Sequence, residues 1–173
     1  MKLKYQILEK EDESALTVEE VKNFLRLSHD YDDSLVKDLI QAATDYAENF
    51  TGKFINTRIV KCLAFQADKE IHIKYAPLNK VLSVEKIVKG ELKDISDSFG
   101  EIDLNEALLE VNPIYYGQDI IIKFSCGYKE KVPYAIKMGI LKHVSAMYEL
   151  SEDSLDPVEE VRNLYLPFRS FKI

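Results

Sequence analysis

The sequence predicts an α+β protein, mainly α-helical, in which a small bundle of about four helices carries an inserted antiparallel β-rich segment. Apolar residues recur at three- and four-residue spacing in 17–52 and again in 133–165, which is the period of amphipathic helices. Residues 55–128 are instead rich in β-branched residues and include runs that alternate apolar and polar side chains, as strands do. A chain of 173 residues fits one domain, which we assign to residues 17–173.

The N-terminal part begins with polar residues and continues into two predicted helices. Residues 1–16 carry four acidic residues between positions 9 and 13, and we expect them to form an acidic arm that is ordered against a neighbour. Thr17 and Glu20 have the spacing of a capping box, which predicts a helix that begins at Thr17. After an Asp-rich turn, the second helix is expected to end at Gly52, because glycine adopts the left-handed conformation that terminates helices.

The β-rich segment is expected to form roughly four to six antiparallel strands joined by short turns. The predicted strands lie in residues 55–65, 71–75, 81–88 and 119–125, with two weaker ones in 102–104 and 108–111.

Two further helices are predicted after the strands. Pro133 suits the first turn of the third helix. Gly139 costs that helix about 1 kcal/mol relative to alanine, which suggests a close helix crossing at this position. The fourth helix is expected to begin at Pro157. The tail after it comprises residues 166–173. The segment from Leu164 to Ile173 is too apolar to extend into water, so we expect it to pack against another part of the protein or against a partner.

The net charge of −7 is distributed unevenly along the chain. Residues 9–48 contain twelve acidic and four basic residues, a net charge of −8. Binding to nucleic acid relies on Lys and Arg side chains that displace counterions from phosphates, so this region argues against ordinary DNA binding. A helical surface with this charge would instead repel phosphates.

Motifs for catalysis or for metal binding are not recognisable in the sequence. The three histidines lack metal-ligand spacing, and the glycines form no phosphate-binding loop. The Asp30, Asp32 and Asp33 cluster resembles the start of a calcium loop, but Leu35 and Gln41 stand where that loop requires Gly and Glu. We therefore predict no catalytic, metal-ligating or cofactor-binding residues.

The two cysteines and the absence of a signal sequence indicate a cytoplasmic protein. Cys62 and Cys126 both lie in apolar, strand-like sequence, and we expect buried free thiols. The N-terminus becomes charged before any apolar stretch forms. No run approaches the roughly 20 apolar residues that a membrane span needs, so we expect a soluble protein without membrane contact.

Aromatic residues are dense near the C-terminus, where Tyr165, Phe168 and Phe171 follow one another. One interpretation is that they belong to a satellite core. The other is that they dock into another subunit, because aromatic and Arg side chains dominate interface energies.

A series of short motifs, taken in order, resembles a known family. The motifs are Leu16-Thr17-Val18-Glu19-Glu20-Val21-Lys22, Leu39-Ile40-Gln41-Ala42-Ala43, Tyr46-Ala47-Glu48-Asn49-Phe50-Thr51-Gly52-Lys53, Ala76-Pro77-Leu78, Phe124-Ser125-Cys126-Gly127-Tyr128, Val132-Pro133-Tyr134-Ala135-Ile136-Lys137 and Leu164-Tyr165-Leu166-Pro167-Phe168-Arg169. Over about 16–170, the chain resembles the head–tail connector, or head-completion adaptor, proteins of tailed bacteriophages and prophages. It departs from their pattern in the longer acidic arm before Leu16 and in Cys126, where a small residue is more usual.

The resemblance implies a structural role without a cofactor. Such proteins form a homo-oligomeric ring of about a dozen copies between the portal protein and a tail-side connector or stopper protein. DNA passes through the ring without specific binding. The implied locations are the bacterial host cytoplasm during assembly and the head–tail junction of the virion.

Two surfaces are expected to serve this role, a docking segment at the C-terminus and an acidic lining of the ring lumen. The docking candidates are Tyr165, Leu166, Pro167, Phe168 and Arg169, and the lumen candidates are Glu19, Glu20, Asp30, Asp32, Asp33 and Asp38.

Two alternatives remain open at the level of sequence. One is a protein-interaction or regulatory domain outside phages that shares the order of helices and strands. The other is a small enzyme that uses scattered carboxylates or Cys126, which precedes Gly127 at the end of a predicted strand.

Overall fold

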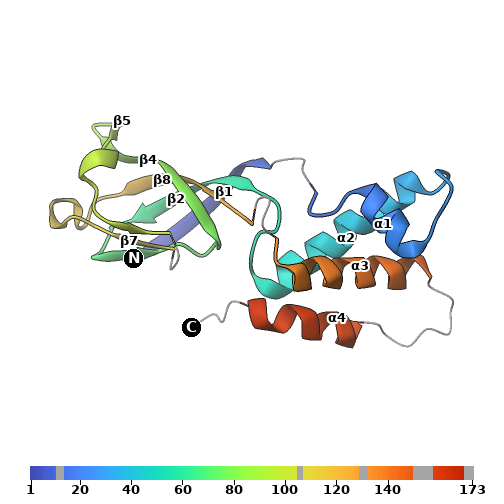
Figure 1. The fold of residues 1–173 in the computed structure, drawn as a ribbon. Helices are drawn as coiled ribbons and strands as arrows, with labels where there is room; N and C mark the ends of the chain where they lie inside the picture. The colour runs from blue at the N-terminus through green and yellow to red at the C-terminus, as the bar shows by residue number, and fades with distance from the viewer. Residues whose placement is uncertain (11–13, 105–106, 129–131, 150–157, 170–173) are drawn as a thin grey trace. The chain divides into compact units, whose positions relative to one another are not determined.

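The computed structural model describes residues 1–10, 14–104, 107–128, 132–149 and 158–169 (Figure 1). The chain divides into two compact units, and each is built from two separate segments. The β unit comprises Met1–Glu11 and Thr57–Tyr128. The helical unit comprises Asp12–Asn56 and Lys129–Ile173. The fold is therefore α+β, as the sequence predicts.

Four α-helices form the described part of the helical unit. They are α1 (Val18–Leu25), α2 (Asp33–Thr51), α3 (Tyr134–Tyr148) and α4 (Val158–Tyr165), followed by a 3₁₀ turn at Leu166–Phe168.

The ends of α1 and α2 confirm the local sequence signals. The Thr17 hydroxyl accepts a hydrogen bond from the Glu20 amide at 3.1 Å, and the Glu20 carboxylate accepts one from the Thr17 amide at 2.8 Å. This is the predicted capping box, which satisfies two N–H groups that a helix start leaves without partners. Helix α2 ends at Gly52, whose φ of 71° is left-handed.

In the described residues, the β unit contains a five-stranded sheet and a three-stranded sheet, and their strand pairs are antiparallel. The larger sheet has the order β1-β2-β8-β4-β5, and the smaller one β3-β7-β6. The bounds are β1 Lys2–Lys10, β2 Arg58–Phe65, β3 Glu70–His72, β4 Leu78–Val88, β5 Glu91–Asp94, β6 Ile102–Asp103, β7 Leu108–Glu110 and β8 Ile120–Cys126.

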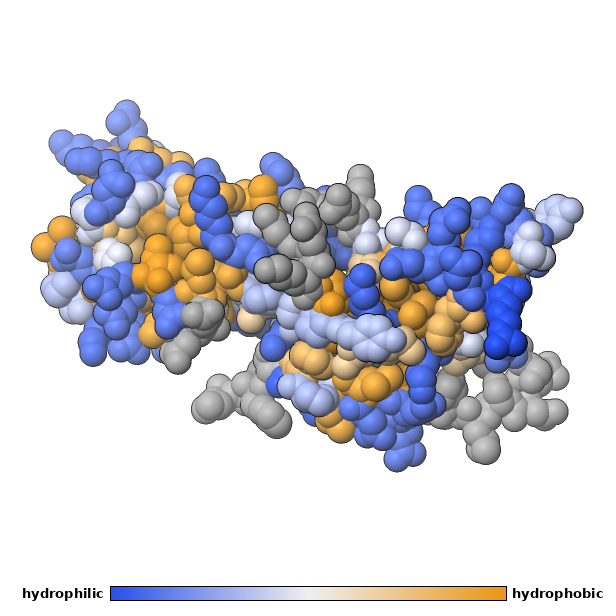
Figure 2. Space-filling view, in the orientation of Figure 1, coloured by the Kyte–Doolittle hydropathy of each residue, from blue (hydrophilic) through white to orange (hydrophobic). Residues whose placement is uncertain are grey.

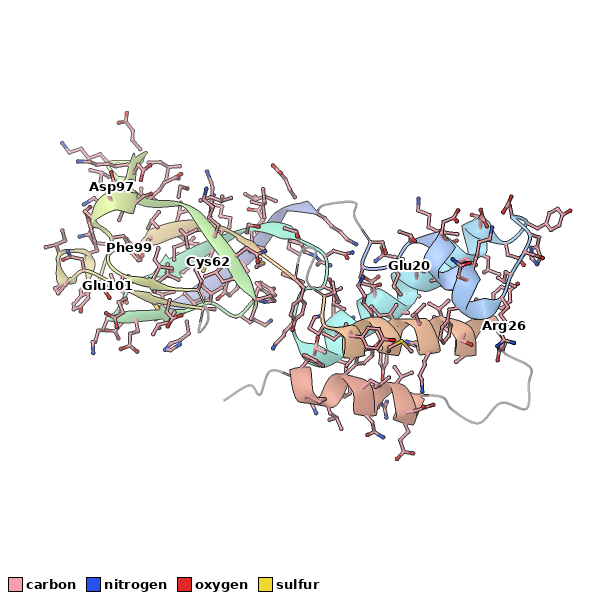
Figure 3. All side chains as sticks on the ribbon, viewed as in Figure 1. Glu20, Arg26, Cys62, Asp97, Phe99 and Glu101 are labelled. Carbon is pink, nitrogen blue, oxygen red and sulfur yellow. The ribbon has the colours of Figure 1, made fainter. Side chains whose placement is uncertain are left out.

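The core of the β unit is lined by alternate residues of the central strands. Cys62 of β2 pairs with Ile122 of β8, and both side chains are fully buried. Burial raises the pKa of the Cys62 thiol to about 11, so this thiol in the interior of the unit is protonated at neutral pH (Figure 3). Cys126 is also fully buried, and both cysteines are free, which confirms the prediction of two buried free thiols.

Residues 1–16 differ from the predicted arm. Lys2–Lys10 form β1, which pairs with β2 at one edge of the five-stranded sheet. On the inner face, Leu3 pairs with Ala64 and Tyr5 with Cys62. The Tyr5 hydroxyl also accepts a hydrogen bond from the Lys74 amide at 3.1 Å. The acidic residues that suggested an arm begin only at Glu9, near the end of the strand.

A second difference lies after Gly90. No strand is predicted between residues 88 and 102, but Glu91–Asp94 form β5, which pairs with β4. All four residues of β5 are exposed. A short, polar strand at a sheet edge has no apolar alternation to reveal it, because neither of its faces is buried.

The chain leaves α2 through a segment held by one buried carboxylate. Glu48 is 8% exposed, and its Oε1 atom accepts hydrogen bonds from the Ile55 amide at 2.9 Å and the Asn56 amide at 3.3 Å. A carboxylate that accepts backbone N–H groups makes stronger hydrogen bonds than a neutral acceptor. Glu48 therefore fixes the segment that follows α2.

Replacing Glu48 with Leu should lower the free energy of unfolding by about 1–3 kcal/mol, because two buried N–H groups lose their acceptor. Urea unfolding followed by circular dichroism measures the change. The matched control is Asp45→Ala, one turn earlier in α2, where Asp45 is exposed and accepts a hydrogen bond from Gln41. It should change stability by less than about 0.5 kcal/mol. Equal effects of the two substitutions would contradict this role of Glu48.

Candidate interaction surfaces

The acidic loop between α1 and α2 is held in place by a lysine. The Lys22 side chain is only 12% exposed, and its ammonium group pairs with Asp30 and, at 2.8 Å, with Asp33. The hydrogen bond from Lys22 holds the pKa of the Asp30 carboxyl group below its usual value. The same two carboxylates raise the pKa of Lys22.

A further contact ties the loop to α3. The Tyr148 hydroxyl donates a hydrogen bond to Asp32 at 2.7 Å, which raises the pKa of Tyr148. Asp30, Asp32 and Asp33 therefore all have partners within the helical unit. A net charge counted from sequence overstates the field of this loop, because Lys22 offsets part of it.

The other three acidic candidates lie on α1 and α2. Glu19, Glu20 and Asp38 are exposed, and Glu20 is engaged in the capping box at the start of α1 (Figure 3). The six acidic candidates thus come from α1, α2 and the loop between them.

The C-terminal candidates divide into one buried residue and four at the surface. Tyr165 has no exposed surface. Its ring lies against Gly139 of α3, where a Cβ atom would overlap the ring, and near Phe50 of α2, with 6.2 Å between ring centroids. Burial raises the pKa of the Tyr165 hydroxyl. Tyr165 is therefore part of the helical core, and it is not available to a partner in this arrangement.

The four residues after Tyr165 reach the surface. Leu166 is 49% exposed, Pro167 and Arg169 are exposed, and Phe168 is half-buried. The Arg169 guanidinium lies over the Phe50 ring, 5.4 Å from its centroid, a favourable cation–π arrangement. The docking candidate is thus reduced to Leu166–Arg169, a segment whose position is set by Tyr165 before it and Phe50 beneath it.

The described residues support neither a metal site nor Cys126 as a nucleophile. No group of three or more His, Cys, Asp or Glu residues in the described ranges could hold a metal ion. Cys126, the candidate nucleophile of the enzyme alternative, is fully buried, and its thiol donates to the Arg58 carbonyl oxygen at 3.9 Å. In the same part of the chain, no helix is long and apolar enough to cross a membrane.

Comparison with known proteins identifies the family. Residues 15–114 match the phage gp6-like head–tail connector proteins. The chain belongs to this family. It is a structural connector protein and not an enzyme. The alternative of an interaction domain outside phages is therefore wrong. A search among curated proteins gave no match.

Solved structures with a similar fold come from phage-like particles. A chain in the neck of an empty GTA particle, computed with C6 symmetry, has a TM-score of 0.79 at 18% identity, with 100% of this chain and 97% of that chain covered. A chain in the virion of a native gene transfer agent (GTA) particle has a TM-score of 0.75 at 18% identity, with 98% and 96% covered. A chain in the neck of a native GTA particle, computed with C12 symmetry, has a TM-score of 0.68 at 16% identity, with 96% and 97% covered.

Sequence reasoning missed the roles of Lys22 and Tyr148, which together hold the acidic loop. Tyr148 lies 116 positions from Asp32, so only the fold brings them together. Gly139 did predict where another helix packs closely on α3, because Tyr165 of α4 contacts α3 at this residue.

The Gly139–Tyr165 contact is testable with a double-mutant cycle. Gly139→Ala should destabilise the protein by about 1–3 kcal/mol through overpacking, despite a gain of about 1 kcal/mol in helix propensity. In a Tyr165→Ala background the overlap is gone, so the same change should be neutral or stabilising. Urea unfolding of the four proteins measures both values. A cost of Gly139→Ala that is unchanged by Tyr165→Ala would contradict the contact.

His143 should make stability depend on pH. Burial lowers its pKa from the ordinary value of 6.5, so the folded protein binds this proton less readily than the unfolded chain does. Neutral His143 contributes fully to the free energy of unfolding above pH about 6.5, and this contribution is lost as the pH falls below that value. The urea midpoint should therefore drop between pH 7.5 and 5.5, and His143→Phe should reduce the drop.

The control for this experiment is His72→Gln, because the His72 side chain is 72% exposed. It should change the drop less than His143→Phe does. The account of His143 is wrong if His143→Phe and His72→Gln give the same pH profile.

Proposed function

We propose that the chain is a subunit of a homo-oligomeric ring at the head–tail junction of a phage-like particle. In this role it binds the portal protein on one side and a tail-side connector or stopper protein on the other. The family match over residues 15–114 is the observation that carries the proposal. The GTA neck structures with C6 and C12 symmetry support a ring of about a dozen copies, assembled after synthesis in the host cytoplasm.

Leu166–Arg169 is the proposed docking segment for the portal protein. An exposed leucine and proline beside an arginine offer both apolar contact and a charged hydrogen-bond donor, a combination that is common in interfaces. The packing of Tyr165 on Gly139 fixes where this segment begins. Holding the segment in place before binding reduces the entropy lost on association.

The acidic surface of α1 and α2 is proposed to face the DNA path. Glu19 and Asp38 are exposed, and carboxylates repel phosphates instead of holding them, so DNA would pass without specific binding. The pairing of Lys22 with Asp30 and Asp33 weakens this repulsion locally. Glu19, Glu20 and Asp38 are therefore the principal lumen candidates, and Asp30, Asp32 and Asp33 contribute less.

The docking proposal is tested by binding of the purified chain to the portal protein from the same genome. Leu166→Asp and Arg169→Glu should each weaken binding at least about tenfold, as loss of an interface hot spot does. Surface plasmon resonance measures the affinity, and circular dichroism checks that each variant is folded. Tyr165 is left unchanged, because its replacement would disturb the helical core.

The matched control is Ile114→Asp, which changes a side chain that is 64% exposed in the β unit. It should bind the portal protein as the parent does. A folded chain that lacks residues 166–173 and still binds with full affinity would contradict the assignment.

A further inference from the structure

The five-stranded sheet has two open edges. Strand β1 pairs only with β2, and β5 pairs only with β4. Within the part of the chain that the structure describes, no hydrogen bond between backbone groups outside these ladders involves residues 2–10 or 91–94. An open edge presents N–H and C=O groups that can pair with another strand.

The two edges carry opposite net charges. Strand β1 contains three lysines and one glutamate, and β5 contains one lysine, one glutamate and one aspartate. Pairing of β1 with β1 would bring lysines of both copies together, and like charges directly opposite are destabilising. Pairing of β5 of one copy with β1 of another brings opposite charges together.

Apolar side chains are also exposed at both edges. Of the sixteen large apolar side chains exposed among the described residues, six lie on β1, on the part of the β4–β5 hairpin from Glu85 to Asp94, or next to them. Apolar surface of this kind is visible on the β unit in Figure 2. Clustered apolar exposure marks sites of association more often than scattered exposure does. The six residues are Met1, Ile7, Leu8, Ile87, Val88 and Leu92.

The register of the sheet matches the two edges to each other. Across the sheet, Lys4 pairs with Leu63, Leu63 with Ile121, Ile121 with Glu85, and Glu85 with Asp94. Lys4 and Asp94 therefore stand at opposite ends of one cross-strand row and on the same face. The register shifts in β1 and β4 lie outside this row, between Ile7 and Glu9 and between Leu78 and Ser83.

The direction of the strands completes the match. Four antiparallel pairings separate β1 from β5, so these two strands run in the same direction. When a second copy continues the sheet, its β1 lies parallel to β5 of the first. Such a contact uses two different surfaces and leaves one of each free, which is the head-to-tail geometry from which rings are built.

We propose that neighbouring copies of this chain join through their sheets, with β5 of one copy beside β1 of the next and Asp94 opposite Lys4. The inference rests on the proposed ring and adds which surfaces meet in it. The partner is a second copy of the chain. The contact requires no residue of the docking segment Leu166–Arg169.

Disulfide trapping in the purified full chain tests the contact. Lys4→Cys and Asp94→Cys are prepared separately, mixed at high concentration and oxidised. The native Cys62 and Cys126 are fully buried and do not interfere. The mixture should give a disulfide-linked dimer with one chain of each kind, and each variant alone should give much less.

The matched control replaces Asp94→Cys with Lys93→Cys. Lys93 is the adjacent residue of β5, and successive side chains of a strand point to opposite faces. Its mixture with Lys4→Cys should therefore give little product. Equal trapping with position 93, no trapping above this control, or more product from Lys4→Cys alone would each overturn the proposal.

Charge reversal gives a second test, with the oligomeric state read by sedimentation velocity. Asp94→Lys should weaken self-association about two- to fivefold, and adding Lys4→Glu to it should restore association. Oligomers that form normally with Asp94→Lys would overturn the edge contact but leave the ring intact. Failure of the parent chain to associate, together with no trapped product from the mixture of the two cysteine variants, would count against both.

Discussion

The pairing of β1 with β2 joins two parts of the β unit that are separated in sequence by residues of the helical unit. It brings residues 2–10 alongside Arg58–Phe65. The chain therefore begins in the β unit, forms α1 and α2 in the helical unit, and returns to the β unit at Thr57. Glu48 holds the segment that precedes this return. Each unit is closed by a distant segment, because β1 completes a sheet formed by residues 58–126 and α3 completes a core begun by α1 and α2. Such long-range closure has a cost in chain entropy that the buried surfaces must exceed.

Short-range sequence patterns correctly predicted the helix ends and strands that depend on neighbouring residues. The capping box at Thr17, the left-handed Gly52 and the six predicted strands depend on neighbouring residues, and all appear in the structure. The strand β1 was missed because its half-buried side chains gain their meaning only from β2, more than 50 positions away. Tyr165 was misjudged for a similar reason, since an aromatic residue near a chain end looks the same in sequence whether Gly139 receives it or a partner does.

The structure accounts for function through surfaces instead of reactive groups. The shifted pKa values have causes within one unit: burial for Cys62, pairing with carboxylates for Lys22, and hydrogen bonds for Asp94 and Tyr148. The features left over are a short exposed segment after a buried tyrosine, an acidic helical surface and two open sheet edges of opposite charge. The proposed role needs surfaces of these kinds, because in that role the chain would contact a partner, leave DNA free and meet its own copies.

Native-state hydrogen exchange tests the interleaved architecture most directly. Amides of residues 2–10 that bond to β2 should exchange with nearly the same opening free energy as those of Arg58–Phe65, because the two strands form one cooperative ladder. Exchange of residues 2–10 at the rate of an unstructured peptide, with β2 and β8 still protected, would show that this segment is an arm after all. That result would contradict both the fold described for the β unit and the sheet edge from which the ring contact is inferred.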